Sequence, residues 1–239
     1  MRRWGFYHTM PTMANLVSRF AKKLAFFTKM EHPTSMRCFL LPGMGADERM
    51  YDAEWDRLGD VTRINWPHDN NARSLTDLAQ QIIADYGIQS RDRIIGSSLG
   101  GMVACEIANH CLDLDLILIG SATSPKEITT LLTWLHPLID LAPLPLFQFS
   151  VGSCPLELMR MFQTSSSEFL RTMSKAVFVW KGLSTNQTQI LRIHSKRDMV
   201  IPCPENADFT LEGGHLIVMS HSKECVDIIL RHFMQNPQS

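Results

Sequence analysis

The sequence lacks long hydrophobic runs, because no uninterrupted apolar stretch approaches the roughly 18 residues that a membrane-spanning helix needs. It also lacks an excess of charge of one sign, with 23 lysines and arginines against 24 aspartates and glutamates. Without a basic footprint over the whole chain, we expect no nucleic-acid partner. Hydrophobic residues make up 45% and charged residues 20% of the 239 positions, which is typical of a globular protein.

Sequence signatures of metal and cofactor binding are missing as well. The chain has no His-Glu-x-x-His, no Walker sequence and no Gly-x-Gly-x-x-Gly after a strand, so we expect no metal and no organic cofactor. Its cysteines are scattered and form no Cys-x-x-Cys pair: they are Cys38, Cys105, Cys111, Cys154, Cys203 and Cys225. This spacing favours free thiols in a reducing compartment over a disulfide framework. We therefore expect a cytoplasmic protein.

Basic residues are concentrated at the N-terminus, where the first 30 residues contain six lysines and arginines and no acidic residue. Residues 15–30 can form a basic amphipathic helix with Leu16, Phe20, Leu24 and Phe27 on one side. Such a helix predicts a weak contact with a membrane surface or a targeting presequence, as the alternative to a cytoplasmic location. The other interpretation is that translation starts at Met30 or Met36 and that residues 1–35 form a flexible extension that the fold does not need.

From Met36 onward, short apolar runs alternate with longer amphipathic segments, which is typical of strands and helices around a parallel sheet. The pattern predicts six strands, at residues 36–41, 61–66, 93–96, 114–119, 189–193 and 207–211. It predicts helices at residues 48–58, 74–86, 99–110 and 222–234. We expect one domain over residues 36–239, of α/β class, with a mainly parallel, doubly wound sheet of about six strands.

The alternation breaks between about residues 121 and 185, where no strand pattern occurs but many large apolar side chains do. Because long structureless loops are rare in compact domains, we expect this insertion to form a helical cap over the sheet. Apolar cap residues are predicted to line a substrate pocket, namely Trp134, Leu135, Leu144, Phe147 and Met161. The alternative is that these side chains only pack the cap onto the sheet.

Residues 96–100 (Gly-Ser-Ser-Leu-Gly) match the pattern Gly-x-Ser-x-Gly, with Ser98 at the centre, between a predicted strand and a predicted helix. Glycines two positions before and after Ser98 allow a very tight turn. Such a turn is expected to hold Ser98 in a strained backbone conformation, with its hydroxyl exposed at the helix N-terminus. Ser97 is less suitable as a nucleophile because Ile95 and Leu99 would occupy the two crowded positions.

A serine hydroxyl needs a base, and the base needs an acid to orient it. In a parallel sheet, functional groups gather at the carboxyl ends of the strands. Asp198 follows the strand at 189–193, and His215 follows the strand at 207–211. His221 is the competing base, whereas His194 is poorly placed to bridge Asp198 and Ser98. We favour His215 as the base because of its placement.

Hydrolysis by a serine also needs backbone N–H donors for the developing oxyanion. The N–H of Leu99, directly after Ser98, is one candidate. The second is expected from the loop after the first strand, where Pro42-Gly43-Met44-Gly45 forms a small-residue turn, and Met44 N–H is our candidate. The other interpretation of this loop is a plain glycine-rich turn.

Four segments together resemble a serine hydrolase of the α/β-hydrolase superfamily: LLPGMGADERMYD, IIGSSLGGMVACEIA, IHSKRDMVIP and LEGGHLIVM, which occur in the family's order. The resemblance covers residues 36–234 and is to small, cap-bearing and mostly uncharacterised members. It implies the α/β-hydrolase fold, with Ser98 as nucleophile, His215 as base and Asp198 as its orienting acid. The chain departs from the pattern at Pro42-Gly43, where many relatives have His-Gly, and this departure concerns the second oxyanion donor.

These residues predict an enzyme that cleaves carboxylic esters or thioesters of small apolar acyl groups through an acyl-enzyme on Ser98. Hydrolysis of carbon–carbon bonds, lyase chemistry and acyl transfer are alternatives, because they reuse the same three residues. A serine at the nucleophile position argues against epoxide and haloalkane hydrolysis, which normally use aspartate. The alternative from a different class is a non-catalytic binding protein on the same fold.

Overall fold

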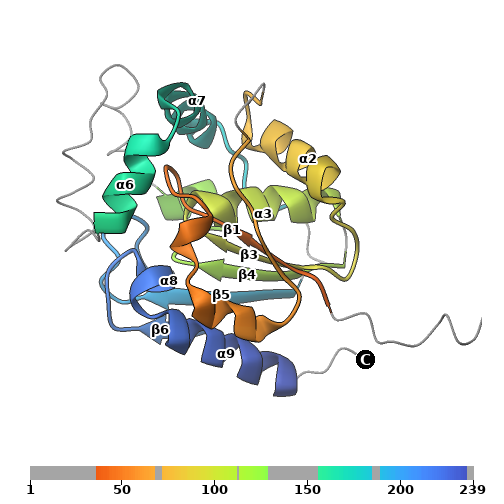
Figure 1. The fold of residues 1–239 in the computed structure, drawn as a ribbon, viewed down its shortest axis with the longest axis vertical. Coiled ribbons are helices and arrows are strands. Elements are labelled where there is room, and N and C mark those ends of the chain that lie inside the picture. Colours follow the sequence, from red (N-terminus) through yellow and green to blue (C-terminus); the bar gives the residue numbers. More distant parts are fainter. Residues whose placement is uncertain (1–35, 68–71, 112, 129–155, 185–188, 236–239) are drawn as a thin grey trace, which may run out of the picture. The chain divides into compact units, whose positions relative to one another are not determined.

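In the computed structural model, six strands within the described residues form one sheet (Figure 1). They are β1 (Cys38–Leu41), β2 (Val61–Arg63), β3 (Arg93–Ser97), β4 (Asp115–Ile119), β5 (Gln189–Ser195) and β6 (Phe209–Leu211). The strands lie in the order β2-β1-β3-β4-β5-β6, and every neighbouring pair is parallel. The predicted six-stranded α/β architecture is therefore confirmed, and the sheet is wholly parallel.

The structure describes residues 36–67, 72–111, 113–128, 156–184 and 189–235. These ranges belong to one compact unit. The N-terminal extension at 1–35, with the amphipathic helix expected at 15–30, lies outside the described residues, so that expectation stays a prediction. Among the described residues, no helix has both the length and the apolar character needed to cross a membrane.

Successive strand residues contribute to two hydrophobic cores on opposite faces of the sheet. Phe39, Ile94 and Leu116 lie in one core, whereas Leu40 and Ile95 lie in the other. Because helices cover both faces, all five residues of β3 and all five of β4 are buried. This double burial explains why the apolar residues of β3 and β4 follow one another directly, as Ile94-Ile95 and as residues 116–119, without polar alternation.

Helices cover the two faces in two groups. The first core is closed by α2 (Leu75–Tyr86), α3 (Leu99–His110) and α7 (Ser167–Phe178). The second is closed by the 3-10 helix η2 (Ala53–Leu58) and by α6 (Leu156–Thr164), α8 (Ile217–Ser220) and α9 (Ser222–Gln235). Figure 1 shows α2 and α3 on one side of the sheet and α9 on the other, which confirms the doubly wound arrangement.

The predicted helix at 74–86 begins and ends where the sequence indicates. The Ser74 hydroxyl accepts a hydrogen bond from Asp77 N–H, and the Asp77 side chain accepts one from Ser74 N–H, which completes a capping box. Gly87 ends the helix in the left-handed conformation, with φ of 61°.

The single helix predicted at 48–58 is wrong in detail, because the structure has two 3-10 helices there, η1 (Glu48–Met50) and η2. Asp47 caps η1 by accepting a hydrogen bond from Arg49 N–H. Asp52 caps η2 by accepting one from Glu54 N–H. The side chain of Asp52 thus begins a second helix after Tyr51, whose backbone is extended.

The long segment between β4 and β5 is described at residues 120–128 and 156–184 only. It contains the short 3-10 helix η3 (Pro125–Ile128), α6 and α7. The helical cap expected over residues 121–185 stays a prediction, because residues 129–155 lie outside the described part of the chain.

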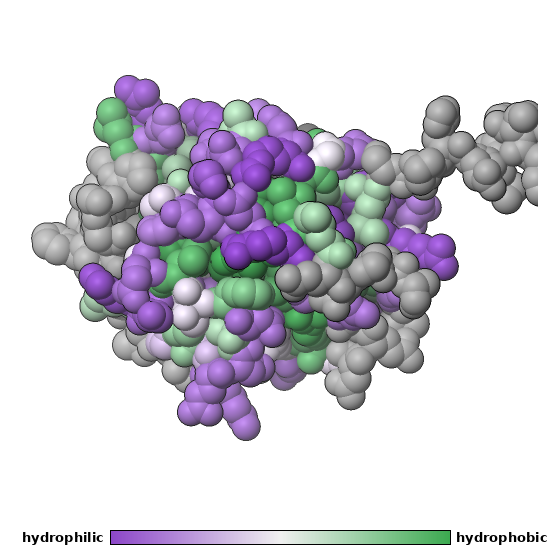
Figure 2. Space-filling view, turned by 90° about the horizontal axis from the view of Figure 1, so that it is seen from below, coloured by the Kyte–Doolittle hydropathy of each residue, from purple (hydrophilic) through white to green (hydrophobic). Residues whose placement is uncertain are grey.

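The solvent side of α9 carries charged residues and is joined to η2 by an ion pair. Asp227 pairs with Arg57 at 2.7 Å and with Lys223 at 2.6 Å. Figure 2 shows hydrophilic residues flanking hydrophobic ones on the face seen from below. Exposed pairs of this kind contribute little to stability, so the hydrophobic contacts beneath α9 hold it on the sheet.

Candidate active site

Ser98 lies in the turn between β3 and α3 and has φ of 52° and ψ of −118°. A positive φ is unfavourable for a residue with a side chain, so surrounding contacts must hold it. Ser98 N–H donates to the Ile119 carbonyl at 3.3 Å, and Ser121 Oγ donates to the Ser98 carbonyl at 2.7 Å. Both polar backbone groups of Ser98 are therefore anchored to β4 and to the residues that follow it.

Two glycines make this turn possible. A Cβ at Gly96 would overlap the carbonyl group of Gly100, and a Cβ at Gly100 would overlap the carbonyl oxygens of Leu41 and Pro42. All these obstacles are backbone atoms that cannot rotate away. Gly100 thus lets the start of α3 lie directly against the end of β1, which brings Ser98 next to the loop that follows β1.

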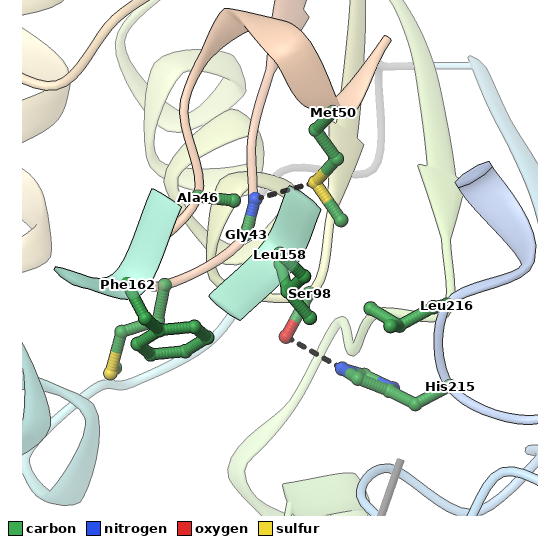
Figure 3. Close-up of a pocket in the computed structure, with 9 residues that line it drawn as sticks. Gly43, Ala46, Met50, Ser98, Leu158, Phe162, His215 and Leu216 are labelled. Atoms are coloured by element: carbon green, nitrogen blue, oxygen red, sulfur yellow. Dashed lines mark hydrogen bonds between the residues drawn. The ribbon is translucent and has the colours of Figure 1, made fainter. Parts of the chain in front are cut away.

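Ser98, His215 and Asp198 form one continuous hydrogen-bonded chain. His215 Nε2 lies 2.9 Å from Ser98 Oγ (Figure 3), and His215 Nδ1 lies 2.8 Å from Asp198 Oδ2. His215 and Asp198 are both buried. With Asp198 accepting at Nδ1, the unprotonated nitrogen of a neutral His215 is Nε2, which can take the proton of the serine hydroxyl.

The carboxylate of Asp198 is held by the turn after β5. Its Oδ1 accepts hydrogen bonds from Val200 N–H and Ile201 N–H, both at 2.9 Å. Its Oδ2 faces two imidazoles, those of His215 and His194. Burial raises the pKa of Asp198, but the charge of His215 and hydrogen bonds from His194, His215 and Ile201 N–H outweigh it and hold the pKa well below its ordinary value.

Contacts between neighbouring loops position His215. Ser195 Oγ, at the end of β5, donates to the carbonyl of Gly213, two residues before His215. Gly120, after β4, has φ of 54° and lies beside both partners: a Cβ there would be 3.2 Å from the His215 carbonyl oxygen and 3.4 Å from Asp198 Oδ2. The competing base, His221, instead has its Nδ1 2.8 Å from Ser220 Oγ.

The two candidate oxyanion donors lie at the same site as Ser98. Leu99 is the first residue of α3, and Met44 lines the pocket that contains Ser98. Among the described residues, neither Leu99 N–H nor Met44 N–H donates to a protein acceptor. Both donors are therefore available to a ligand at the N-terminus of α3.

A small apolar pocket that is partly open to solvent lies beside Ser98. Figure 3 shows side chains from four parts of the chain around it. The lining residues are Gly43, Met44, Ala46, Met50, Ser98, Leu158, Phe162, His215 and Leu216. Within the described residues, no group of three or more His, Cys, Asp or Glu side chains is placed to hold a metal ion.

The pocket residues expected from the sequence are only partly described. Trp134, Leu135, Leu144 and Phe147 lie outside the described residues, and their predicted role stays a prediction. Met161 is not among the described residues that line this pocket, and its side chain is fully buried in the second core. Leu158 and Phe162, which share another stripe of the same helix at a spacing of four residues, line it instead.

Sequence reasoning missed Met50 and Leu216 as lining residues. Leu216 directly follows His215, so its proximity was available from the chain order. Met50 lies on η1, after the loop that follows β1, and only the packing of η1 brings it to Ser98.

A model of the alpha/beta hydrolase family matches residues 4–228 of the sequence. The chain belongs to the alpha/beta hydrolase family. No curated protein matches the chain in sequence.

Several solved structures of this fold are similar. A thermophilic esterase from Thermogutta terrifontis aligns with a TM-score of 0.66 and 15% identity, over 84% of this chain and 90% of its own. The type II thioesterase BorB from the borrelidin biosynthetic cluster has a TM-score of 0.60 and 19% identity, over 84% and 94%. A meta-cleavage product hydrolase from Pseudomonas fluorescens has a TM-score of 0.58 and 15% identity, over 84% and 91%. At these identities the likeness shows the fold.

Proposed function

We propose that this protein is a serine hydrolase that cleaves carboxylic esters or thioesters of small apolar acyl groups through an acyl-enzyme on Ser98. The observation that carries the proposal is the hydrogen-bonded chain from Ser98 Oγ through His215 to Asp198, at 2.9 and 2.8 Å, beside an apolar pocket. A serine on a strained turn, a buried histidine and a buried carboxylate in this order are the parts that acyl transfer requires.

In the first half of the proposed reaction, Ser98 Oγ attacks the acyl carbon and its proton passes to His215 Nε2. The bond from that carbon to the leaving oxygen or sulfur then breaks, and His215 gives the proton to the departing alcohol or thiol. In the second half, His215 takes a proton from water, the hydroxide attacks the acyl-enzyme, and Ser98 recovers its proton as the carboxylic acid leaves. Asp198 remains ionised throughout and orients the imidazole.

Each tetrahedral intermediate carries a negative oxygen, which needs donors that are already in place. Leu99 N–H and Met44 N–H are our proposed donors. Their lack of a protein acceptor among the described residues supports this assignment, and so does the position of Leu99 at the N-terminus of α3, where the helix dipole favours negative charge.

The pocket lining supports an uncharged acyl group. Apart from Ser98 and His215, the described lining residues are apolar or glycine. A carboxylate in this pocket would lose its hydration without gaining a cationic partner from the described lining, which is costly. Methylene groups placed there gain up to about 0.8 kcal/mol each until the space is filled. We therefore propose short to medium acyl chains.

Two of the similar structures bear on the choice of bond. The Thermogutta protein is named an esterase and BorB a thioesterase. The meta-cleavage product hydrolase keeps carbon–carbon bond hydrolysis as the second candidate. The same three residues can hydrolyse esters, thioesters and carbon–carbon bonds, so an assay must decide between these substrates.

A hydrolysis panel tests this proposal. Purified protein is assayed with p-nitrophenyl esters and acyl thioesters from acetyl to dodecanoyl, with matched neutral and carboxylated acyl groups and Ser98→Ala as the control. We expect kcat/KM to rise and then fall with chain length and to favour the neutral series. No turnover above that of Ser98→Ala on any ester or thioester would overturn the proposal. A clear preference for the carboxylated series would overturn the proposal of an uncharged acyl group and leave the proposed serine hydrolase chemistry in place.

For cellular location we propose the cytoplasm, which the scattered cysteines support. The described cysteines, Cys38, Cys105, Cys111, Cys203 and Cys225, are free thiols. The weak membrane contact expected from residues 15–30 stays a prediction.

A further inference from the structure

The loop after β1 is held by the polar groups of Gly43. Its N–H donates to the buried sulfur of Met50 at 3.3 Å (Figure 3). Its carbonyl oxygen accepts two hydrogen bonds, from the indole Nε1–H of Trp66 at 3.1 Å and from Ala46 N–H at 3.2 Å. Gly43 therefore has little freedom to rotate about its backbone bonds.

The direction of Met44 N–H follows from these bonds. The carbonyl of Gly43 and the N–H of Met44 belong to one planar peptide group, and in a trans peptide they point in opposite directions. The described residues contain no cis peptide. Because Trp66 and Ala46 fix the carbonyl on one side, Met44 N–H must point to the other side. A Cβ at Gly43 would lie 3.6 Å from the Cβ of Ser98, so this peptide borders the nucleophile.

The neighbouring residues fix the loop from a second direction. Ser165 Oγ donates to the carbonyl of Gly45 at 3.0 Å, and the ring of Phe162 covers Gly45, where a Cβ would overlap it. Trp66 itself packs against Phe169 of α7, with ring centroids 5.5 Å apart. The indole is thus held in place by a helix that is separate from the loop.

We propose that Trp66 is a positioning residue for the oxyanion site: its indole N–H fixes the Gly43–Met44 peptide so that Met44 N–H faces the substrate carbonyl. This inference rests on the proposed hydrolase function. The indole supplies a side-chain hydrogen bond to the loop from the segment that follows another strand, β2.

The test removes the indole N–H and keeps an aromatic ring. In Trp66→Phe, we expect kcat for a neutral ester to fall about tenfold, which is less than the roughly hundredfold or greater loss seen when an oxyanion donor is removed outright. KM should stay within about twofold, because ground-state binding does not use this donor. Affinity for an alkyl boronic acid, whose tetrahedral adduct places an oxyanion at the site, should fall by the same factor as kcat.

Trp55→Phe is the matched control. Trp55 is fully buried, and its Nε1 has no hydrogen-bond partner in the described structure. The control therefore removes an indole N–H that makes no hydrogen bond in the described structure, and we expect its kcat and boronic acid affinity to match the wild type.

If Trp66→Phe folds poorly, as judged by circular dichroism, benzothienylalanine at position 66 replaces the indole N–H by sulfur at nearly constant shape, and the same loss is expected. Wild-type kcat and boronic acid affinity in either folded variant would overturn the inference while leaving the hydrolase intact. A wild-type protein that neither hydrolyses esters nor reacts at Ser98 with a fluorophosphonate would overturn the proposed function, and this inference with it.

Discussion

The buried imidazole of His194 lies against the carboxylate of Asp198, with His194 Nε2 3.4 Å from Asp198 Oδ2. The same nitrogen lies 2.7 Å from the Ile201 carbonyl oxygen. Because a carbonyl oxygen only accepts hydrogen bonds, Nε2 carries the proton. Asp198 Oδ2 therefore lies between His194 and His215, and we expect His194 to help orient the carboxylate that we propose as the orienting acid for His215.

Removing the N–H of His194 should weaken catalysis without abolishing it. We expect His194→Phe to lower kcat about tenfold, because the Asp198 carboxylate loses one of the contacts that fix its direction. His194→Gln offers an amide N–H at similar reach and should recover part of the loss. Steady-state kinetics on a neutral ester measures both variants. A folded His194→Phe protein with wild-type kcat would show that Asp198 needs no help from His194.

The lowered pKa of Asp198 predicts that the stability of the folded protein depends on pH. Its pKa in the folded protein lies below the ordinary value of 3.8, because the charge of His215 and the hydrogen bonds described above outweigh the effect of burial. A depressed pKa stabilises the fold at pH values above the unfolded-state pKa, and this contribution is lost as pH falls toward the folded-state pKa.

Comparison with Asp198→Asn isolates this contribution from that of the other carboxylates. We expect the difference in unfolding free energy between wild type and Asp198→Asn to move against the wild type as pH falls from about 5 to about 2, where the carboxylate of Asp198 becomes protonated. Urea unfolding of both proteins at graded pH measures the difference. A difference that does not change over this range would contradict the depressed pKa.

Phe162 should limit the length of the acyl chain. Its ring lines the pocket beside Ser98 (Figure 3), so Phe162→Ala enlarges the space. We expect the preferred acyl chain to lengthen, with kcat/KM rising by up to about fourfold for each methylene that finds new space. Kinetics on the graded ester series measures the shift.

Met161→Ala is the control for that experiment. Met161 is one residue away on α6 but fully buried in the core. Its truncation should lower the unfolding free energy by about 3 kcal/mol and leave the preferred acyl length unchanged. If Met161→Ala shifted the preference as much as Phe162→Ala, the assignment of the pocket wall would be wrong.

The two candidate bases give opposite expectations. His215→Ala should reduce kcat by several orders of magnitude, because Ser98 loses the group that takes its proton. His221→Ala should keep kcat within about threefold of the wild type, because His221 bonds to Ser220 and not to Ser98 or Asp198 in the described structure. The reverse result would make His221 the base.

Sequence periodicity predicts the fold well because the residues that start, end and bury each helix or strand lie within or next to that element. The apolar residues of β3 and β4 follow one another without polar alternation since both faces of these strands are covered, and α2 carries its own start and stop signals at Ser74 and Gly87. The helix predicted at 48–58 failed because its apolar residues were visible but the capping effect of Asp52 within the run was overlooked.

The chain Ser98, His215 and Asp198 was predictable for a different reason. A parallel sheet brings the ends of β3, β5 and β6 to one edge, so chain order and strand assignment suffice to place the three side chains together. Trp66 and Met50 were not predictable in this way. Their contacts with Gly43 depend on how η1 and the residues after β2 pack in three dimensions, which no local pattern records.

The central claim is that Ser98 is a nucleophile activated by His215. Intact-mass spectrometry after incubation with a fluorophosphonate, followed by peptide mapping, tests it most directly. We expect one adduct per chain, located on Ser98, no adduct in Ser98→Ala and labelling slowed by at least about a hundredfold in His215→Ala. A wild-type protein that forms no adduct, or that forms it at another residue, would contradict the account.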